Sequence, residues 1–348
     1  MILFYVVLIF VLLYQCNFKI RGLFSCYLEK ERCNAIKGIF IVVVFFRHVS
    51  SYLLKIGFEP KGFLDKSFFL VDNLIGQLLV AMFLFYSGYG VMRSISIKGS
   101  GYLMSFPRKR LFTTLLNFDV AVCCFLFIDF IFNIPLSAYQ IGFSFIAWES
   151  VGNSNWYIFV ILLCYFITYV SYLIVKIWGG HICVLVLGMS LFSMMFLSVV
   201  KDNCWYNTIL CYSAGMYYSI YKQKIENIAQ KHYSILVTCI GGAFVLLFVY
   251  NYYPTPQLFG LSYNLLSISF AILLVLITMK VQIYNNALVW LGANLFPLYI
   301  YQRLPMIGIK ELSGNDWVCH NAYLYIVLCL TITFVISYFY KFWKLTLK

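Results

Sequence analysis

Lys37 and His48 are the two residues whose types and spacing most directly suggest chemistry. They lie eleven residues apart within one apolar run. Eleven residues make about three turns of an α-helix, so both side chains project from one face, about 16 Å apart along the axis. An imidazole can take up a proton near neutral pH and return it, and a cation further along the same face can attract an anionic ligand. The spacing therefore predicts a general base at His48 and an anion-binding residue at Lys37.

Two further charged residues within apolar runs are expected to have a structural role. Arg47 lies about 100° around the helix from His48, so it faces a different partner. An unpaired charge inside a membrane costs several kcal/mol. We therefore expect Arg47 to form an ion pair with Asp129, which lies at a comparable depth in the run 111–133.

A third feature is the cationic run Arg108-Lys109-Arg110, which directly follows Pro107. Three adjacent cations after a proline that can begin a helix are suited to binding a ligand with several phosphates. Other interpretations remain open: the triplet can contact anionic lipids, Lys37 can extend to lipid head groups, and His48 can hydrogen-bond a neighbouring helix.

The elements that position these residues are membrane helices. The chain has 348 residues, of which 63% are hydrophobic and 11% charged, and its mean hydropathy is +0.88. A soluble domain has roughly 25% charged residues, so a soluble enzyme, a disordered chain and a secreted disulfide scaffold are excluded. A spanning helix needs about 20 residues. We predict an all-α polytopic membrane helix bundle of about eleven transmembrane helices, at 1–16, 36–54, 74–92, 111–133, 156–175, 182–200, 205–220, 234–252, 260–279, 287–302 and 322–340.

The loops between these runs carry unequal charge, which predicts the orientation of the chain. With the loop 17–35 inside, 17 of the 25 Lys and Arg residues fall inside, 6 fall outside and 2 lie within a helix. Because Lys and Arg remain on the cytoplasmic side, we expect the N-terminus outside and the C-terminus in the cytoplasm of a cell inner membrane. The net charge of +13 is then an orientation signal and gives no indication of nucleic-acid binding.

The cysteine and histidine patterns do not predict a metal site. The 12 cysteines contain no C-x-x-C pair, and three of the four histidines fall in loops or at helix ends. The cysteines are therefore interpreted as small apolar residues.

Several short motifs, taken in order along the chain, resemble the acyltransferase-3 family of integral membrane acyltransferases. Lys37 and His48 resemble its first core helix, in which a basic residue, usually Arg, precedes the catalytic His by ten intervening positions. The other matching segments are Phe85-Tyr86-Ser87-Gly88-Tyr89, the basic patch Phe106 to Arg110, Asn155-Trp156-Tyr157, and Leu291-Gly292 with Pro297-Leu298-Tyr299-Ile300-Tyr301-Gln302.

The sequence departs from the family pattern at four points. Lys37 replaces the commoner Arg and loses its two-pronged hydrogen bonding. The Glu that many members carry after the Trp is absent, since Val160 and Ile161 stand in that region. Gln302 occupies the position of the late His, and Arg47 beside His48 is unusual.

The resemblance implies a division of the chain and a set of roles. Residues 1–33 would be an additional N-terminal transmembrane helix and cytoplasmic loop, and residues 34–348 the acyltransferase domain. His48 would be catalytic, with acyl-CoA, most often acetyl-CoA, as a co-substrate rather than a permanently bound cofactor. The expected donor-binding residues are Lys37, Arg108, Lys109 and Arg110, and the candidate supporting residues are Tyr52, Ser87, Trp156 and Gln302.

The activity expected from this resemblance is O-acylation, in particular O-acetylation, of a surface or capsular polysaccharide or its lipid-linked precursor. Two alternatives remain open. A transporter or flippase of a lipid-linked sugar would share the helix count and the basic loops. A non-catalytic relative that binds acyl-CoA would explain the missing Glu and late His. The acceptor sugar, the acyl chain length and the oligomeric state do not follow from the sequence.

Overall fold

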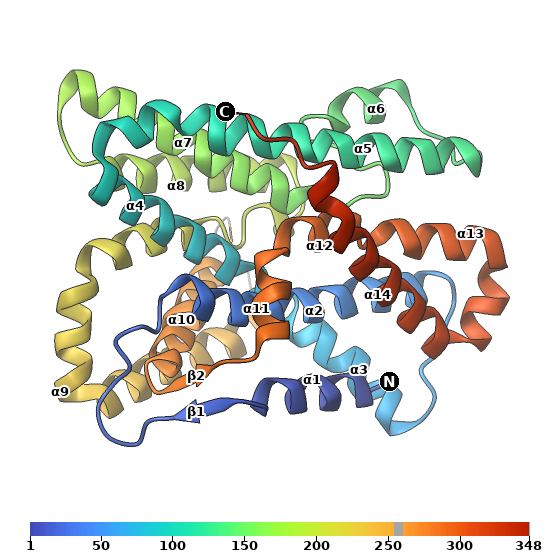
Figure 1. The fold of residues 1–348 in the computed structure, drawn as a ribbon, viewed down its shortest axis with the longest axis horizontal. Helices are drawn as coiled ribbons and strands as arrows, with labels where there is room; N and C mark the ends of the chain where they lie inside the picture. Colours follow the sequence, from blue (N-terminus) through green and yellow to red (C-terminus); the bar gives the residue numbers. More distant parts are fainter. Residues whose placement is uncertain (254–259, 348) are drawn as a thin grey trace.

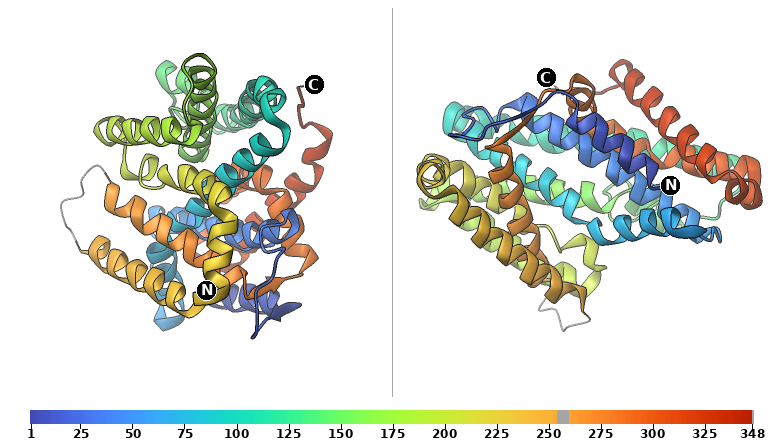
Figure 2. Two further views of the ribbon diagram at one scale, coloured as in Figure 1. Left: turned by 90° about the vertical axis from the view of Figure 1, so that its left-hand side faces the viewer. Right: turned by 90° about the horizontal axis from the view of Figure 1, so that it is seen from below.

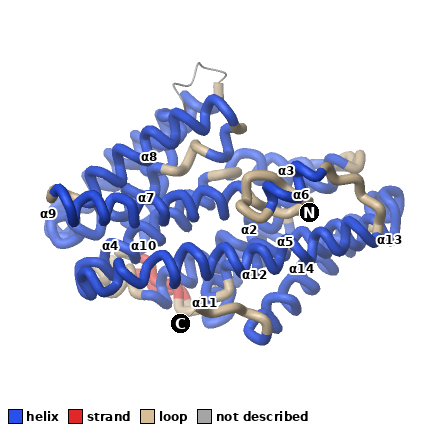
Figure 3. Tube along the Cα trace, turned by 90° about the horizontal axis from the view of Figure 1, so that it is seen from above, coloured by secondary structure: helices blue, strands red, loops and turns tan. Residues whose placement is uncertain are grey.

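The computed structural model describes residues 1–253 and 260–347, and the described chain is almost entirely helical (Figures 1 and 3). Within these residues the only sheet is one short antiparallel pair of strands. The predicted all-α membrane bundle is therefore confirmed. In chain order the elements are α1 (Leu3–Leu13), β1 (Cys16–Phe18), α2 (Lys30–Lys55), α3 (Gly62–Ile75), α4 (Leu78–Phe106), the π-helix η1 (Pro107–Phe112), α5 (Thr113–Ile131), α6 (Ala138–Ser144), α7 (Trp156–Trp178), α8 (Ile182–Val200), the 3-10 turn η2 (Asn203–Trp205), α9 (Leu210–Tyr252), α10 (Leu261–Thr278), β2 (Val281–Ile283), α11 (Asn286–Ala293), α12 (Leu295–Tyr301), α13 (Arg303–His320), α14 (Ala322–Phe339) and the 3-10 turn η3 (Tyr340–Phe342).

Seven helical stretches of the described chain are long and apolar enough to cross a membrane. Two of them, Gly62–Ile131 and Asn203–Tyr252, each contain two of the predicted runs. In the second stretch α9 bends at His232, where φ is −132° and ψ is 36° (Figure 1). The seven stretches thus account for nine of the eleven predicted runs.

The two remaining runs, 1–16 and 287–302, are corrected by the structure. Helix α1 has 11 residues, so it is about 16 Å long and does not cross a hydrocarbon core of about 30 Å as a continuous helix. It lies alongside α2 and ends where Gln15 adopts a φ of 60° and the chain turns into β1, which pairs with β2 (Figure 2). The run 287–302 divides into α11 and α12 at Asn294, whose side chain bonds back to the Trp290 carbonyl at 2.9 Å.

Two pairs of helices approach so closely that only glycine fits at the contact. A Cβ at Gly88 of α4 would fall on the Tyr212 carbonyl of α9, and one at Gly215 of α9 would fall on the Phe85 carbonyl of α4. Small residues permit this close approach of helix backbones in membranes. The α2–α11 contact is built in the same way, with Gly38 on one helix and Gly292 on the other.

Candidate active site

A cavity of about 1120 Å³ lies among α2, α4, α7, α12 and the segment that follows α14. Seven of its lining residues are Lys or Arg, and one, Glu29, is a carboxylate. This excess of positive charge is suited to a ligand with several anionic groups. The seven cations are Lys30, Lys37, Arg93, Arg110, Lys222, Lys341 and Lys344.

Most of these cations have no carboxylate partner. In the part of the chain that the structure describes, Lys222 is the only one of the seven in an ion pair, at 2.8 Å from Glu226. Lys37 is half-buried, and its Nζ donates to the neutral Asn34 side chain at 3.1 Å. Its charge therefore remains available to an anionic ligand.

The structure separates the three residues of the basic triplet. All three lie on the π-helical turn η1, and such turns occur frequently at functional sites. Arg110 lines the cavity, where it faces Tyr102 and Tyr165. Arg108 and Lys109 are exposed, and neither is among the described residues that line the cavity. Of the three residues of the triplet, Arg110 is therefore the one placed to bind a phosphate in this cavity.

Ser87 lines the cavity, whereas the other supporting candidates lie elsewhere. The Ser87 hydroxyl is 3.0 Å from the hydroxyl of Tyr165, another lining residue. Trp156 begins α7 beside Tyr157, with ring centroids 6.3 Å apart, and is not among the described lining residues. Tyr52 lies one turn beyond His48 on α2.

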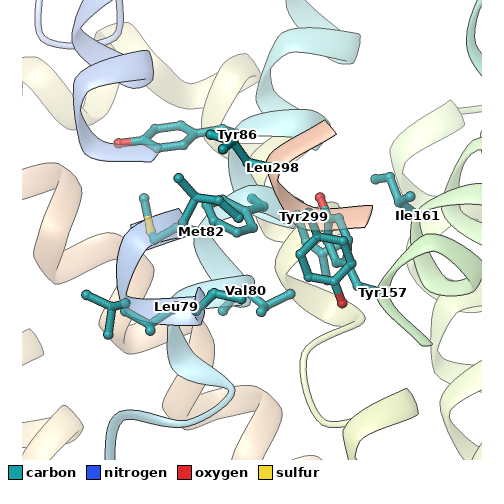
Figure 4. Packing of buried hydrophobic residues seen from close by; sticks show 14 of the residues in the cluster. Leu79, Val80, Met82, Tyr86, Tyr157, Ile161, Leu298 and Tyr299 are labelled. Carbon is teal, nitrogen blue, oxygen red and sulfur yellow. The ribbon is translucent and has the colours of Figure 1, made fainter. Parts of the chain in front are cut away.

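Three aromatic rings of the cavity lining form a group that adjoins His48 through Tyr299. Tyr157 and Tyr299 pack edge to face with ring centroids 5.2 Å apart (Figure 4). The Phe83 ring lies 6.0 Å from that of Tyr157. The His48 ring is 6.1 Å from Tyr299 and only 9% exposed. Tyr299 lines the cavity, and His48 is not among the described lining residues. His48 therefore lies immediately behind Tyr299.

Gln302 and Arg303 complete the surroundings of His48. The Gln302 side chain lies beside the imidazole, and its Nε2 donates to the Tyr299 carbonyl at 2.9 Å. The Arg303 guanidinium stands over the Tyr52 ring at 5.9 Å, and its charge also acts on His48. Gln302, which occupies the late His position, thus lies beside His48, the candidate base. Arg303, the next residue in the chain, brings a positive charge to the same place.

The predicted ion pair between Arg47 and Asp129 does not form in the described structure. Helices α12 and α13 each contact both α2, which carries Arg47, and α5, which carries Asp129. Arg47 instead acts electrostatically on Asp72 of α3, which accepts a hydrogen bond from Tyr5. Asp129 is 4% exposed.

The segment after α14 is held against the cavity by Asn117. The Asn117 side chain accepts hydrogen bonds from the Tyr340 hydroxyl at 2.8 Å and from the Leu345 amide at 2.9 Å, and it donates to the Leu345 carbonyl at 2.8 Å. The Trp343 indole donates to the Tyr301 hydroxyl at 3.3 Å. These bonds fix the segment that carries Lys341 and Lys344.

In the sequence, most of these cations indicate only the orientation of the chain in the membrane. Arg93, Lys222, Lys341 and Lys344 come from segments far apart in the chain, and only the fold brings them to one cavity. The charge pattern of the sequence places Arg303 among the 6 outer Lys and Arg residues. Its place directly after the late motif was the signal that pointed to the site.

Fold and site together define a polytopic membrane protein with a cation-lined cavity, one lining residue of which, Tyr299, lies beside a buried histidine. The model of the family described as Acyltransferase domain (Acyl_transf_3) matches residues 31–341, so the chain belongs to this family. The chain is therefore a membrane acyltransferase. Comparison with curated proteins gives no match, and neither does comparison with solved structures.

Proposed function

We propose that this protein is an O-acetyltransferase that moves an acetyl group from cytoplasmic acetyl-CoA to a hydroxyl of a surface or capsular polysaccharide or its lipid-linked precursor. The observation that carries the proposal is the cavity, in which seven cations accompany one carboxylate and the lining includes Tyr299, whose ring lies beside His48. Acetyl-CoA has its phosphates at one end and its thioester at the other. The cations hold the phosphates, and the thioester extends past Tyr299 toward His48.

In the proposed reaction His48 acts as general base. It takes the proton of the acceptor hydroxyl as the hydroxyl oxygen attacks the thioester carbonyl carbon. The C–S bond breaks, and the protonated imidazole returns the proton to the leaving sulfur, which releases CoA and the acetyl ester. Histidine suits both proton transfers because its ordinary pKa is about 6.5.

The proposed orientation places the open, cationic part of the cavity in the cytoplasm. All the lining cations except Lys37 belong to loops or helix ends that the charge bias assigns to the inner side, and Lys37 lies at the inner mouth of its helix. The donor then enters from the cytoplasm of a cell inner membrane, with the N-terminus outside and the C-terminus inside.

Transfer of label from radiolabelled acetyl-CoA tests this function in sealed membrane vesicles that contain the chain and the extracted surface polysaccharide. We expect label in the polysaccharide as an alkali-labile ester only when the donor is offered to the face that carries the C-terminus. A flippase of a lipid-linked sugar would move that lipid without taking up label. A non-catalytic relative would bind acetyl-CoA and transfer nothing.

Loss of charge in the cavity is expected to weaken donor binding. Lys37→Met and Arg110→Gln each remove a cation that would bond a phosphate, and a hydrogen bond to a charged group contributes about 1.5–3 kcal/mol. Each change should therefore raise the Kd for acetyl-CoA about tenfold or more. Lys37→Arg should keep the affinity because Arg holds phosphate with two parallel bonds. Titration calorimetry on the purified protein measures these values.

Lys224→Gln is the matched control, since Lys224 is exposed on the same helix as Lys222 and is not among the described lining residues. Binding should also weaken with salt, because exposed charges are screened beyond about 8 Å at physiological ionic strength. An unchanged Kd in both Lys37→Met and Arg110→Gln would contradict the assignment of this cavity to CoA phosphates.

The segment after α14 is expected to contribute to donor affinity through its anchor. Asn117→Ala removes the hydrogen bonds to Tyr340 and Leu345, so the segment loses its fixed position and Lys341 and Lys344 leave the cavity wall. The Kd for acetyl-CoA should rise by about as much as in the double variant Lys341→Gln/Lys344→Gln. The triple variant Asn117→Ala/Lys341→Gln/Lys344→Gln should raise the Kd little further, because loss of the anchor and loss of the charges act through the same two cations. Additive effects would show that Asn117 acts by another route.

A further inference from the structure

Six polar side chains around His48 each have one buried atom for which the described residues offer no well-formed hydrogen bond, although Gln302 lies close to His48 and Ser154 lies close to Tyr299. These atoms are His48 Nδ1, Asn153 Nδ2, Ser154 Oγ, Tyr299 Oη, Gln302 Oε1 and Arg303 Nε. Except for Arg303, each of these residues is at most 9% exposed. More than about 90% of buried polar groups in native proteins have a hydrogen-bond partner, so six in one cluster require an explanation.

The six residues adjoin one another although they come from three parts of the chain. Arg303 Nη1 donates to the Asn153 carbonyl at 3.3 Å, and Ser154 lies beside Tyr299. Tyr299 lies 6.1 Å from His48 between ring centroids, and Gln302 lies beside His48. The cluster therefore surrounds the candidate base, and its member Tyr299 also lines the cation-lined cavity.

The chemistry of these atoms fits a sugar. Asn153 Nδ2 and Arg303 Nε are donors, Gln302 Oε1 is an acceptor, and the hydroxyls of Ser154 and Tyr299 can be either. A sugar hydroxyl both donates and accepts, so a set of mixed donors and acceptors matches neighbouring hydroxyls on one ring.

Arg303 adds a charge that a neutral sugar would not satisfy. Among the described residues it forms no ion pair, and its one hydrogen bond is to a neutral carbonyl. Removing a charge from water without an opposite charge is costly, and Arg is the side chain best shaped to hold a carboxylate or phosphate. A bound anion would offset that cost.

We propose that Arg303, with Asn153, Ser154 and Gln302, forms the acceptor-binding site and selects a sugar that carries a carboxylate or phosphate near the hydroxyl to be acetylated. The inference rests on the proposed transferase function and names the class of its acceptor. The anion pairs with Arg303, and the neighbouring hydroxyls bond the other cluster residues. The reacting hydroxyl is thereby held beside His48.

The test is binding of matched probes to the purified protein: glucuronic acid, its uncharged amide glucuronamide, glucose 1-phosphate and glucose. We expect the two anionic probes to bind more tightly than the two neutral ones, and Arg303→Gln to remove this difference by weakening the anionic probes about 10- to 100-fold. Arg303→Lys should retain part of the preference, since it keeps the charge and loses the fork.

Acetyl-CoA binding serves as the folding control and should be unchanged in Arg303→Gln. Lys310→Gln is the matched control on the same helix, because Lys310 is paired with Glu311 at 2.6 Å and is outside the cluster. The anionic probe that binds more tightly identifies the anion: glucuronic acid indicates a carboxylate, and glucose 1-phosphate indicates a phosphate. Equal binding of charged and uncharged probes, or a preference that survives Arg303→Gln, overturns the inference. If these probes bind as expected but acetyl-CoA neither binds nor donates, the proposed function fails while the anionic sugar site stands.

Discussion

Replacing His48 with Ala or Gln is expected to abolish acetyl transfer while acetyl-CoA still binds. His48 lies behind Tyr299 and outside the cavity, so its loss removes no contact with the CoA phosphates. A general base acts in the transition state and contributes typically about 10²–10⁴-fold to the rate. The rate constant for transfer should fall by that factor, with the Kd for acetyl-CoA within about twofold of wild type.

Single-turnover transfer and calorimetric donor binding, measured on the same preparation, separate the two effects. His320→Ala is the control, since His320 is exposed at the end of α13 and its Nδ1 lies 2.7 Å from the carbonyl of Asp316 on the same helix. Full transfer activity in His48→Ala would refute the proposed mechanism. Loss of the folded protein would instead show that His48 has a packing role. The Gln variant keeps a polar side chain of similar size, so it tests for that packing role independently.

Nine of the eleven apolar runs were predictable because each residue of a membrane helix responds to the same solvent, so composition over about 20 residues identifies it. The exceptions have local causes. α1 ends at Leu13, and two residues later Gln15 adopts a φ of 60°, because the following residues pair with β2 far along the chain. The break between α11 and α12 depends on the side chain of Asn294, and hydropathy does not report it.

The candidate site could be predicted only in part. Features set by residues close together in the sequence were predictable, and features set by residues far apart in the sequence were not. Lys37, His48 and Arg110 were identifiable because helical spacing and adjacency are local properties. The convergence of Lys222 and Lys344 on the same cavity is a tertiary property and has no local pattern. The expected pairing of Arg47 with Asp129 was wrong because similar depth in the membrane does not specify which helices are neighbours.

The same distinction between local and tertiary properties applies to the glycines of the motifs. The motif pattern locates these glycines in the sequence, but their packing role depends on the fold. Gly88 and Gly292 belong to two of the motif segments, and the structure shows that each faces the backbone of a partner helix. The motif that contains Ser87 therefore has two functions. It places a hydroxyl in the cavity, and it fixes α4 against α9 one residue later.

Gly88→Val is expected to destabilise the folded protein severely. The new Cβ would fall on the Tyr212 carbonyl, which is backbone and cannot move without separating α4 from α9. Overpacking a well-packed core costs typically about 1–3 kcal/mol, and a clash with backbone that the core cannot absorb belongs at or above the upper end of that range. We expect a much lower melting temperature in detergent and little folded protein in the membrane.

Gly101→Ala tests whether the effect of Gly88→Val comes from this contact and not from the loss of a glycine in α4. Gly101 lies further along α4, beyond the non-helical backbone at Gly99, and no atom outside its own stretch of helix backbone lies within 4 Å of the position of its Cβ. Ala favours a helix over Gly by about 1 kcal/mol, so Gly101→Ala should be neutral or stabilising. Gly215→Val should reproduce the defect of Gly88→Val from the other helix, since it meets the Phe85 carbonyl at the same interface. Because α4 and α9 also carry Arg93 and Lys222 to the cavity, any folded Gly88→Val protein should bind acetyl-CoA less tightly. A melting temperature equal to wild type in both Val variants would show that the two helices do not pack as closely as described.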